Sequence, residues 1–384
     1  MSETLRLPQG FLTASGTAGI KASGKPDCAL IVADAPVRWA LATTTNTLKA
    51  ACVTRNRALF GGGGPVRAVA INSGNANCAT GVQGARANER FAAAAAALGA
   101  APDEVLTAST GIIGEPLPVE KLERVVPLIA AQPTDDAGTL AQAILTTDLV
   151  RKTSAVTLGN GARIVGVAKG SGMIHPNMAT MFGFILTDAD LPQATLRRLW
   201  QEVVGKSFNQ VTVDGDTSPN DMAFLLANAR LAVDESEFVW GLTQVAQDLA
   251  KQIARDGEGA TKLLSVRVTG AASDTQAQRA ARAVVLSPLV KSAAHGNDPN
   301  WGRILSSVGA TGVRLALDRL SIRLQGVEVY RGAPERFDAA EVSRKMNAKD
   351  LTIDLDLAVG TGAGQAWGCD LSAEYVKINA DYHT

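Results

Sequence analysis

Cysteine, histidine and aromatic residues are scarce in this sequence. Its 384 residues include 4 cysteines and 3 histidines, and aromatic residues make up 4% of the chain. Neither the ligand spacing of a zinc site nor a dense disulfide pattern is found among Cys28, Cys52, Cys78 and Cys369. We therefore predict reduced thiols in a cytoplasmic protein that holds no metal ion.

An excess of one charge is also lacking. Lysine and arginine together number 37, aspartate and glutamate also number 37, and no basic block is interleaved with aromatics. These absences argue against nucleic acid as a partner. No apolar run approaches the roughly 20 residues that a membrane span needs, and the N-terminus has no apolar signal core. We therefore expect no membrane association. Because no Walker-type loop or dinucleotide fingerprint is present, we also expect no bound cofactor.

Hydrophobic residues make up 46% of the chain, which suffices for one large or two medium domains. Short β-branched runs alternate with helical patterns, as is typical of an α/β protein. We predict strands at 28–33, 68–71, 163–168, 181–187, 211–213 and 263–270, and we expect 43–47 to join the sheet. Helices are predicted at 84–98, 118–129, 137–144, 238–253 and 274–284, and from the 187–192 segment to about 206.

One loop, residues 169–181, joins two apolar strands and delivers Thr180 to the first position of a buried strand. Such a loop makes sense if the Ala179–Thr180 bond is to be cut. The Thr180 hydroxyl would attack the Ala179 carbonyl, and water would then release a new N-terminus. The freed α-amine, with a pKa of about 7.7–8.0, could act as general base for the hydroxyl. The alternative is an ordinary strand threonine after an ordinary glycine turn.

The loop sequence Lys-Gly-Ser-Gly-Met-Ile-His-Pro-Asn-Met-Ala-Thr-Met resembles the self-cleavage signature of the ornithine acetyltransferase family, also called glutamate N-acetyltransferases. Further segments agree with that family, among them the Asn-rich loop at 72–81, Asp-Gly-Asp-Thr-Ser-Pro-Asn-Asp at 214–221, Arg-Asp-Gly-Glu-Gly-Ala-Thr-Lys at 255–262, residues 287–303, and the tail at 368–384. The resemblance extends from near residue 10 to the C-terminus. Mild departures are the order of Cys78 and Ala79, Pro219, and His383.

The resemblance implies a fold and a processing event. The fold would be an N-terminal-nucleophile-like α-β-β-α arrangement with a smaller C-terminal α/β lobe. Self-cleavage would give an α chain, residues 1–179, that carries the oxyanion-hole loops. The β chain, residues 180–384, would begin with the nucleophile and include the smaller lobe and the tail. The two chains would assemble as a heterotetramer or a larger oligomer.

Site residues also follow from the resemblance. Thr110 and Gly111 correspond to the oxyanion hole, where a hydroxyl and a close backbone N–H meet the developing charge. By itself a Ser-Thr-Gly triplet is common in turns. The predicted substrate contacts are Thr147 (with Thr146 as the alternative), Lys169, Thr180, Glu258, Asn379 and Thr384. From the residues alone, Lys169 could lower the pKa of the Thr180 amine or bind an anionic substrate, and Glu258 could lie on a simple helix C-cap turn.

Polar loops elsewhere leave several readings open. The Asn-rich loop at 72–81 is either a helix-capping turn or a neighbour of the site. The carboxylates of Asp214, Asp216 and Asp221 could cap backbone amides or contact a cationic amine, whereas a calcium loop does not fit their spacing. We expect Lys291, Asn300 and Arg303 to organise a loop or a carboxylate pocket.

The implied activity is a ping-pong acetyl transfer from N2-acetylornithine to glutamate through an acetylated Thr180, in cyclic arginine biosynthesis. Some family members also take the acetyl group from acetyl-CoA as a co-substrate. The rival enzyme is an amidohydrolase, in which water accepts the acyl group, or a secondary-metabolism relative with another acceptor amine. The non-enzymatic alternative is a small-molecule-binding protein with an inert Thr180.

Overall fold

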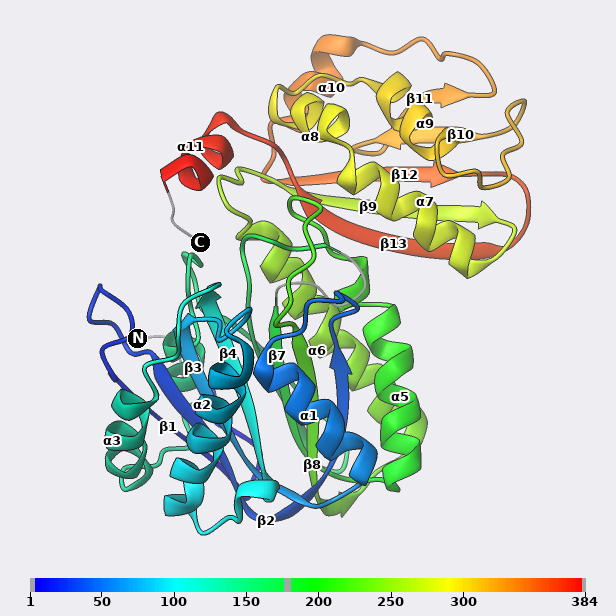
Figure 1. Cartoon of the computed structure of the whole chain (residues 1–384). Helices are drawn as coiled ribbons and strands as arrows, with labels where there is room; N and C mark the ends of the chain where they lie inside the picture. Colours follow the sequence, from blue (N-terminus) through cyan, green and yellow to red (C-terminus); the bar gives the residue numbers. More distant parts are fainter. Residues whose placement is uncertain (1–3, 176–180, 382–384) are drawn as a thin grey trace.

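The computed structural model describes residues 4–175 and 181–381. The larger lobe of the protein is built on eight strands (Figure 1). Hydrogen bonding arranges seven of them in the order β4-β3-β2-β8-β7-β6-β5, and β1 pairs with β2 off this path. Their bounds are β1 (Phe11–Gly16), β2 (Cys28–Thr43), β3 (Val66–Asn75), β4 (Val105–Ile112), β5 (Lys152–Thr157), β6 (Arg163–Lys169), β7 (Phe182–Asp190) and β8 (Met222–Ala232).

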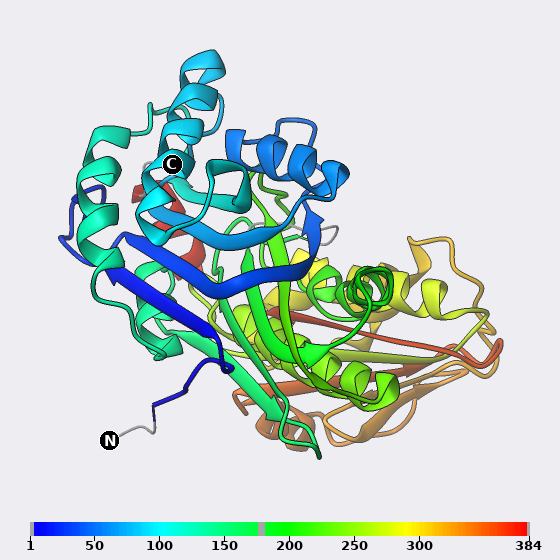
Figure 2. The same cartoon turned by 90° about the horizontal axis from the view of Figure 1, so that it is seen from below.

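The long strand β2 divides this sheet into two layers. Its first half pairs with β1 and β3, its register with β3 breaks between Val32 and Val37, and residues 38–43 then pair with β8. The β1–β4 layer and the β5–β8 layer therefore pack face to face, as the view in Figure 2 shows. Apolar side chains of both layers share one core, which includes Ile31, Phe184 and Phe224.

Helices cover the two outer faces of these layers. The helices α2 (Gly81–Ala94) and α3 (Val119–Ala130) pack on β1–β4, and α5 (Gln193–Gly205) and α6 (Glu235–Arg255) pack on β5–β8. The predicted α-β-β-α arrangement is confirmed. Two more helices, α1 (Ala51–Gly62) and α4 (Ala137–Ala143), contribute to the core between the layers.

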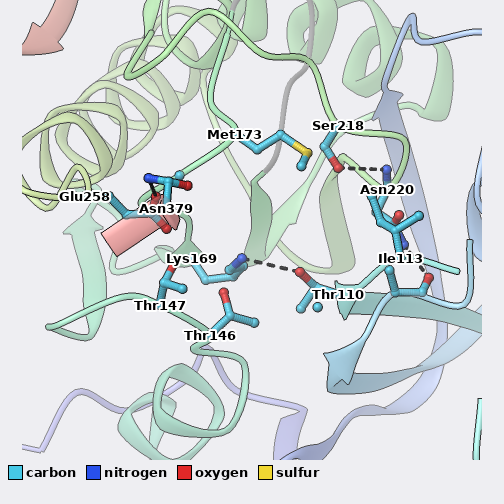
Figure 3. Close-up of a pocket in the computed structure, with 13 residues that line it drawn as sticks. Thr110, Ile113, Thr146, Thr147, Lys169, Met173, Ser218, Asn220, Glu258 and Asn379 are labelled. Carbon is cyan, nitrogen blue, oxygen red and sulfur yellow. Dashed lines mark hydrogen bonds between the residues drawn. The ribbon is translucent and has the colours of Figure 1, made fainter. Parts of the chain in front are cut away.

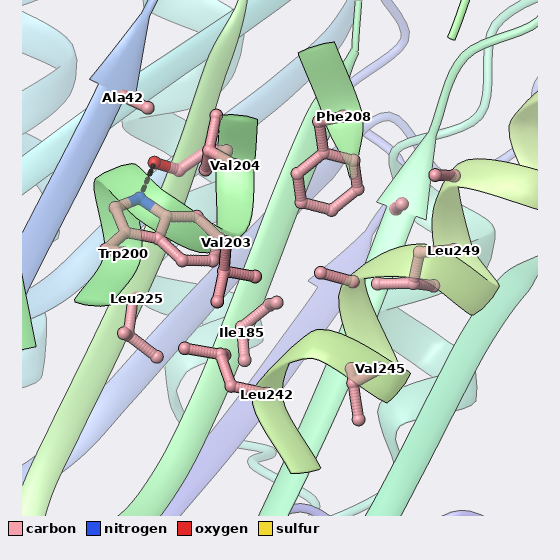
Figure 4. Close-up of a cluster of buried hydrophobic side chains, with 14 of the residues drawn as sticks. Ala42, Ile185, Trp200, Val203, Val204, Phe208, Leu225, Leu242, Val245 and Leu249 are labelled. Atoms are coloured by element: carbon pink, nitrogen blue, oxygen red, sulfur yellow. Dashed lines mark hydrogen bonds between the residues drawn. The ribbon is translucent and has the colours of Figure 1, made fainter. Parts of the chain in front are cut away.

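Strand β7 shows how the sequence fits two cores at once. Phe184 faces the core between the layers and stacks on Phe224, with ring centroids 5.3 Å apart. Ile185, the next residue, faces the helices together with Trp200 and Leu249 (Figure 4). Because successive side chains of a strand point to opposite faces, a strand between two cores is apolar throughout instead of alternating with polar residues.

The smaller lobe is an α/β unit made from the C-terminal residues, as predicted (Figure 1). Its five strands run in the order β11-β10-β12-β9-β13. Apolar side chains of this sheet pack against several helices. The strand bounds are β9 (Leu263–Ala271), β10 (Ser321–Leu324), β11 (Val327–Arg331), β12 (Asp350–Asp356) and β13 (Gly362–Cys369), and the helices are α7 (Asp274–Leu286), α8 (Pro288–His295), α9 (Trp301–Gly309) and α10 (Ala339–Met346).

A last helix, α11 (Ala373–Asp381), follows β13 and returns toward the larger lobe (Figure 1). The tail of the chain is thus helical up to Asp381. Within residues 4–175 and 181–381, none of the helices has the length and apolar character needed to cross a membrane.

Most predicted strands and helices are confirmed, with three differences. The segment 43–47 leaves the sheet after Thr43, because the Thr44 hydroxyl donates to the Ser218 carbonyl at 2.7 Å instead of continuing the ladder. Residues 211–213 form a single bridge, Val211 with Trp367, and no strand. Helix α1 is not evident in the sequence, because it has no clear apolar stripe and ends in a glycine run.

The α6 interface predicts a measurable stability difference. Leu249 is 0% exposed and packs on β6, where a Cβ at Gly166 would lie 2.6 Å from its Cδ1. Leu249→Ala should lower the free energy of unfolding by about 2–5 kcal/mol, because it leaves a cavity. Leu128→Ala, the same change at a position that is 67% exposed on α3, should change it by less than about 0.5 kcal/mol. Urea denaturation of both variants tests this, and equal losses would contradict the described packing.

Candidate active site

The candidate site lies at one end of the two layers, where several strands end and two begin. Strand β2 ends at Thr43 opposite Met222, the start of β8, and β6 ends at Lys169 opposite Phe182, the start of β7. Strands β3 and β4 end at the same side. A cavity of about 80 Å³ opens there. Its lining consists of Ala76, Thr110, Gly111, Ile113, Thr146, Thr147, Lys169, Gly172, Met173, Ser218, Asn220, Glu258 and Asn379.

Six of the predicted site residues line this one cavity (Figure 3). They come from five separate parts of the chain: β4, the loop after α4, β6, the turn after α6, and α11. The six are Thr110, Gly111, Thr147, Lys169, Glu258 and Asn379. Thr146, the alternative to Thr147, lines the cavity as well. The predicted scissile pair Ala179–Thr180 and the terminal Thr384 lie outside the described residues, so their roles stay predictions.

Gly111 is required by the close approach of β4 to β3. Its φ is +132°, and a Cβ there would lie 2.3 Å from the carbonyl carbon of Gly74. Only glycine fits such a position. The neighbouring Thr110 is 4% exposed, and its hydroxyl accepts a hydrogen bond from Lys169 Nζ at 3.3 Å. Thr110 and Gly111 thus both lie at the cavity wall, and their role as the oxyanion hole stays a prediction.

Lys169 is an ammonium group buried in this wall, with 3% of the residue exposed. Burial lowers the pKa of Lys169, the nearby Asp148 carboxylate opposes that shift, and the Lys152 ammonium adds to it. The Lys169 side chain therefore gives up its proton more readily than an exposed lysine. A substrate carboxylate beside it would restore the charged form.

Asp221 is the second buried charged group near the start of β7. Its Oδ1 accepts the backbone N–H of Met181 at 2.9 Å, and Met181 is the residue that follows the predicted nucleophile. Burial raises the pKa of Asp221 well above its usual range, and the positive charge of Lys169 offsets only part of this rise. Asp221 therefore fixes the first described residue of the nucleophile strand.

A buried network of charges joins three walls of the cavity. Asp148 Oδ1 accepts from Lys152 Nζ at 2.7 Å and from the Gly170 N–H at 2.6 Å. Lys152 Nζ also donates to Asp256 Oδ2 at 2.5 Å. Both side chains of the Asp148–Lys152 pair are 0% exposed. The network thus ties the loop that carries Thr147 to the Lys169 loop and to the end of α6.

The electrostatic balance of Asp148 reflects this network. Burial alone would raise the pKa of Asp148, but the Lys169 and Lys152 ammonium groups, together with the hydrogen bonds of Lys152 and Gly170, hold that pKa at about 2. Asp148 is therefore a carboxylate at any pH at which the protein would be assayed.

Glu258 is held over the cavity by two neighbouring segments. Its backbone N–H donates to the Ser171 carbonyl at 2.9 Å, and its Oε2 accepts from Asn379 Nδ2 at 2.9 Å. A Cβ at Gly172 would lie 2.4 Å from the Glu258 carboxylate, so a larger residue there would displace the end of the Glu258 side chain. Glu258 is half-buried, and Lys169 is the one cationic residue among the described residues that line the cavity with it.

The acidic segment 214–221 contributes to the site through backbone hydrogen bonds of Asp214 and through two uncharged lining residues. Asp214 accepts the N–H groups of Met173 (2.6 Å) and Ile174 (2.9 Å), and burial raises its pKa to about 6. The backbone-capping alternative is therefore confirmed for Asp214. The cavity is lined from this segment by Ser218 and Asn220.

Asn220 is a site residue that sequence reasoning missed. Its Nδ2 donates to the Ala76 and Ser109 carbonyls, both at 2.6 Å, and so fastens the ends of β3 and β4 to the start of β8. Ala76 also confirms that the Asn-rich loop at 72–81 adjoins the site. The sequence feature that could have identified Asn220 is its place in the 214–221 segment, directly before Asp221.

Lys291, Asn300 and Arg303 organise loops, and none of them lines the cavity. The Asn300 side chain accepts the Arg303 N–H at 3.2 Å and caps α9, while Lys291 Nζ donates to the Val213 carbonyl. Among the residues that the structure describes, no three His, Cys, Asp or Glu side chains gather as metal ligands.

The layered fold and a cavity lined by Thr110, Gly111 and the buried Lys169 are what the predicted acyl-transfer enzyme requires. Comparison with known proteins agrees. The ArgJ family profile matches residues 12–384. An arginine biosynthesis bifunctional protein ArgJ from Deinococcus radiodurans is 53% identical over 98% of this chain and 97% of its own, and one from Thermus thermophilus is 54% identical over 99% and 100%.

A solved structure is also similar. The arginine biosynthesis bifunctional protein of Bacillus halodurans is 39% identical, with a TM-score of 0.51, and the match covers 52% of this chain and 98% of that chain. The chain belongs to the ArgJ family. The predicted resemblance is thereby confirmed: the protein is an acetyltransferase of arginine biosynthesis rather than an amidohydrolase or a binding protein.

Alanine substitutions at two glycines with positive φ test the role of Gly111 at the cavity wall. Gly114 has φ +88° and nothing within 4 Å of an added Cβ, whereas Gly111 would clash with the β3 backbone. Gly114→Ala should therefore cost about 1 kcal/mol of stability and leave turnover unchanged. Gly111→Ala should cost about 3 kcal/mol or more and lower kcat about 100-fold. Thermal melts and steady-state kinetics check both; equal behaviour of the two variants would rule out this account of Gly111.

The buried network makes a pH-dependent prediction. Asp148→Asn removes one of the two carboxylates that pair with the buried Lys152 ammonium and should cost about 3–5 kcal/mol at pH 7. The folded-state pKa of Asp148 is below the ordinary 3.8, so its contribution is complete above that pH and is lost as pH falls toward about 2. The difference between wild type and variant should therefore shrink from pH 4 to pH 2.5. Urea midpoints across this range measure it, and a constant difference would show that the Asp148 charge is not responsible.

Proposed function

We propose that this protein transfers the acetyl group of N2-acetylornithine to glutamate through an acetylated Thr180. The observation that carries the proposal is the convergence of Thr110, Gly111, Thr147 and Lys169 with the carboxylate of Glu258 on one cavity next to the start of β7. Residues 176–180, which connect the Lys169 loop to β7, carry the predicted nucleophile.

The first step is self-cleavage of the precursor. The Thr180 hydroxyl attacks the Ala179 carbonyl, the amide becomes an ester, and water releases residues 1–179 from residues 180–384. The Bacillus halodurans crystal structure supports this cut, because the match covers nearly all of that chain but only 52% of this one. A chain of about half length is what cleavage near the middle leaves.

The second step is acetyl transfer. The freed Thr180 amine accepts the hydroxyl proton, the oxygen attacks the acetyl carbonyl of N2-acetylornithine, and the Thr110 hydroxyl with the Gly111 N–H stabilises the oxyanion. The amine then protonates the departing ornithine nitrogen. Glutamate enters, its amine attacks the acetyl-Thr180 ester, and N-acetylglutamate leaves.

Charge complementarity supports the positions of the substrates. Glu258 faces the cavity as a carboxylate and suits the side-chain amine of ornithine, whereas the buried Lys169 suits a carboxylate that both substrates carry. Thr147, Asn379 and the terminal Thr384 complete the enclosure in this proposal.

Several wider features belong to the same proposal. The relatives from Deinococcus radiodurans and Thermus thermophilus are called bifunctional, which supports acetyl-CoA as a second acetyl donor. We place the enzyme in the cytoplasm and expect the two processed chains to form a heterotetramer or a larger oligomer.

Product analysis separates acetyl transfer from hydrolysis. Purified protein is incubated with N2-acetylornithine, with and without glutamate, and the products are separated by chromatography. We expect N-acetylglutamate and ornithine in equal amounts, and parallel lines in double-reciprocal plots as a ping-pong reaction requires. Release of acetate at the same rate with and without glutamate would instead identify a hydrolase.

The role of Glu258 has its own test. Glu258→Gln keeps the shape and the hydrogen bond to Asn379 but removes the charge that pairs with the ornithine amine. The KM for N2-acetylornithine should rise about 10-fold, since a hydrogen bond to a charged group contributes about 1.5 kcal/mol. Glu374→Gln, on α11 and outside the cavity lining, serves as the matched control and should leave the KM unchanged. An unchanged KM in both variants would remove Glu258 from the substrate site.

A further inference from the structure

A second polar cluster lies just outside the candidate site, where the turn after α6 meets the end of β13 and the end of α8. At its centre is Asp370, the residue after β13, which is 2% exposed and does not line the cavity. Burial of a carboxylate is unfavourable unless hydrogen bonds replace its contacts with water. The hydrogen-bond partners of Asp370 therefore identify what this side chain holds in place.

Four donors surround the Asp370 carboxylate. Oδ1 accepts the backbone N–H groups of Thr261 at 2.8 Å and Lys262 at 2.9 Å, and Oδ2 accepts the Thr261 hydroxyl. Oδ2 also lies 2.7 Å from Nδ1 of His295, at the end of α8. Burial alone would raise the pKa of Asp370, but these four hydrogen bonds hold that pKa below its ordinary value. Because an ionised carboxylate can only accept, the His295 ring donates from Nδ1.

The donors from Thr261 and Lys262 belong to the turn that carries Glu258. In return, the backbone N–H of Asp370 donates to the Lys262 carbonyl at 3.3 Å. Lys262 Nζ also donates to the Ala294 carbonyl of α8 at 2.7 Å. The end of the turn is therefore fastened to the smaller lobe at several points.

The segment that follows Asp370 holds the other side of the same turn. Ser372 Oγ donates to the Gly259 carbonyl at 2.6 Å. A Cβ at Gly259, which has φ +69°, would lie 2.4 Å from a backbone nitrogen of α11, so the turn and this helix are in direct contact. Asn379 of α11 then donates to Glu258 Oε2 (Figure 3). Loss of the Asp370 contacts would therefore loosen both segments between which the Glu258 carboxylate is held.

We infer that Asp370 is a positioning residue, which holds the 257–262 turn so that the Glu258 carboxylate faces the side-chain amine of N2-acetylornithine. The inference rests on the proposed function, which pairs Glu258 with that amine. Asp370 acts through Glu258, because Asp370 itself does not line the cavity. Glutamate has no side-chain amine, so the loss of Asp370 should weaken the use of the acetyl donor and leave the use of the acceptor unchanged.

Asp370→Asn tests this role. The amide keeps the shape and one oxygen for the two backbone N–H groups, but it places a donor where the carboxylate accepted from Thr261 and His295. In a ping-pong reaction, kcat/KM for each substrate depends only on its own half-reaction. We expect kcat/KM for N2-acetylornithine to fall about 5- to 10-fold, as for one weakened hydrogen bond to a charged group, while kcat/KM for glutamate stays unchanged.

Asp338→Asn is the matched control. Asp338 also lies in the smaller lobe, and its carboxylate accepts two backbone N–H groups at the start of α10, away from the cavity lining. This variant should change neither kcat/KM value. If Asp370→Asn does not fold, Thr261→Val removes one of the four donors and should give the same selective loss at about 2- to 3-fold.

A double variant shows whether Asp370 acts through Glu258. Asp370→Asn should add almost nothing to the loss in Glu258→Gln, because the charge that Asp370 positions is already gone, whereas independent roles would multiply the two losses. Multiplied losses, an equal fall in kcat/KM for both substrates, or no fall for N2-acetylornithine in Asp370→Asn would overturn the inference. The proposed function is judged separately, because it is contradicted only if the wild type fails to make N-acetylglutamate from N2-acetylornithine and glutamate.

Discussion

The buried pairing of Lys152 with Asp148 and Asp256 is the interaction on which the candidate site depends. A lone charge at this depth would be strongly unfavourable, so each member is stable only while the others are in place. The three residues belong to the loop before β5, to β5 itself and to the end of α6. Their mutual requirement therefore fixes the distances between the parts of the chain that carry Thr147 and Glu258. Because Asp148 also binds the Gly170 N–H, the Lys169 loop is held in the same frame.

The layered fold explains why so many distant residues meet at one end. The strand ends of both layers open on the same side, and the loops that leave them need not be long to reach a common cavity. The smaller lobe adds the last wall, since β13 leads into α11 and α11 presents Asn379 to Glu258 (Figure 3). A cavity lined by a residue of each charge, Lys169 and Glu258, then suits an amino acid substrate, which itself carries both charges.

Much of this could be predicted from the sequence, and the exceptions have physical reasons. The buried strands were evident because β6 and β7 are apolar throughout, and Thr110, Gly111 and Glu258 were found because a long motif match accompanied them. Helix α1 escaped notice because its burial depends on contacts with β4 and α2 rather than on an apolar stripe of its own. The roles of Asp148 and Lys152 were not foreseeable, because a carboxylate and an ammonium four residues apart look like an exposed pair until the fold buries them.

The most direct measurement for the whole account is the denaturing intact mass of freshly purified protein, beside a Thr180→Ala variant. The account predicts two polypeptides for the wild type, residues 1–179 and 180–384, and one uncut chain for the variant. A wild-type chain that stays whole over days, or a variant that is cut at the same bond, would show that Thr180 is not the activated nucleophile. The acetyl-threonine mechanism would then have to be abandoned for this protein.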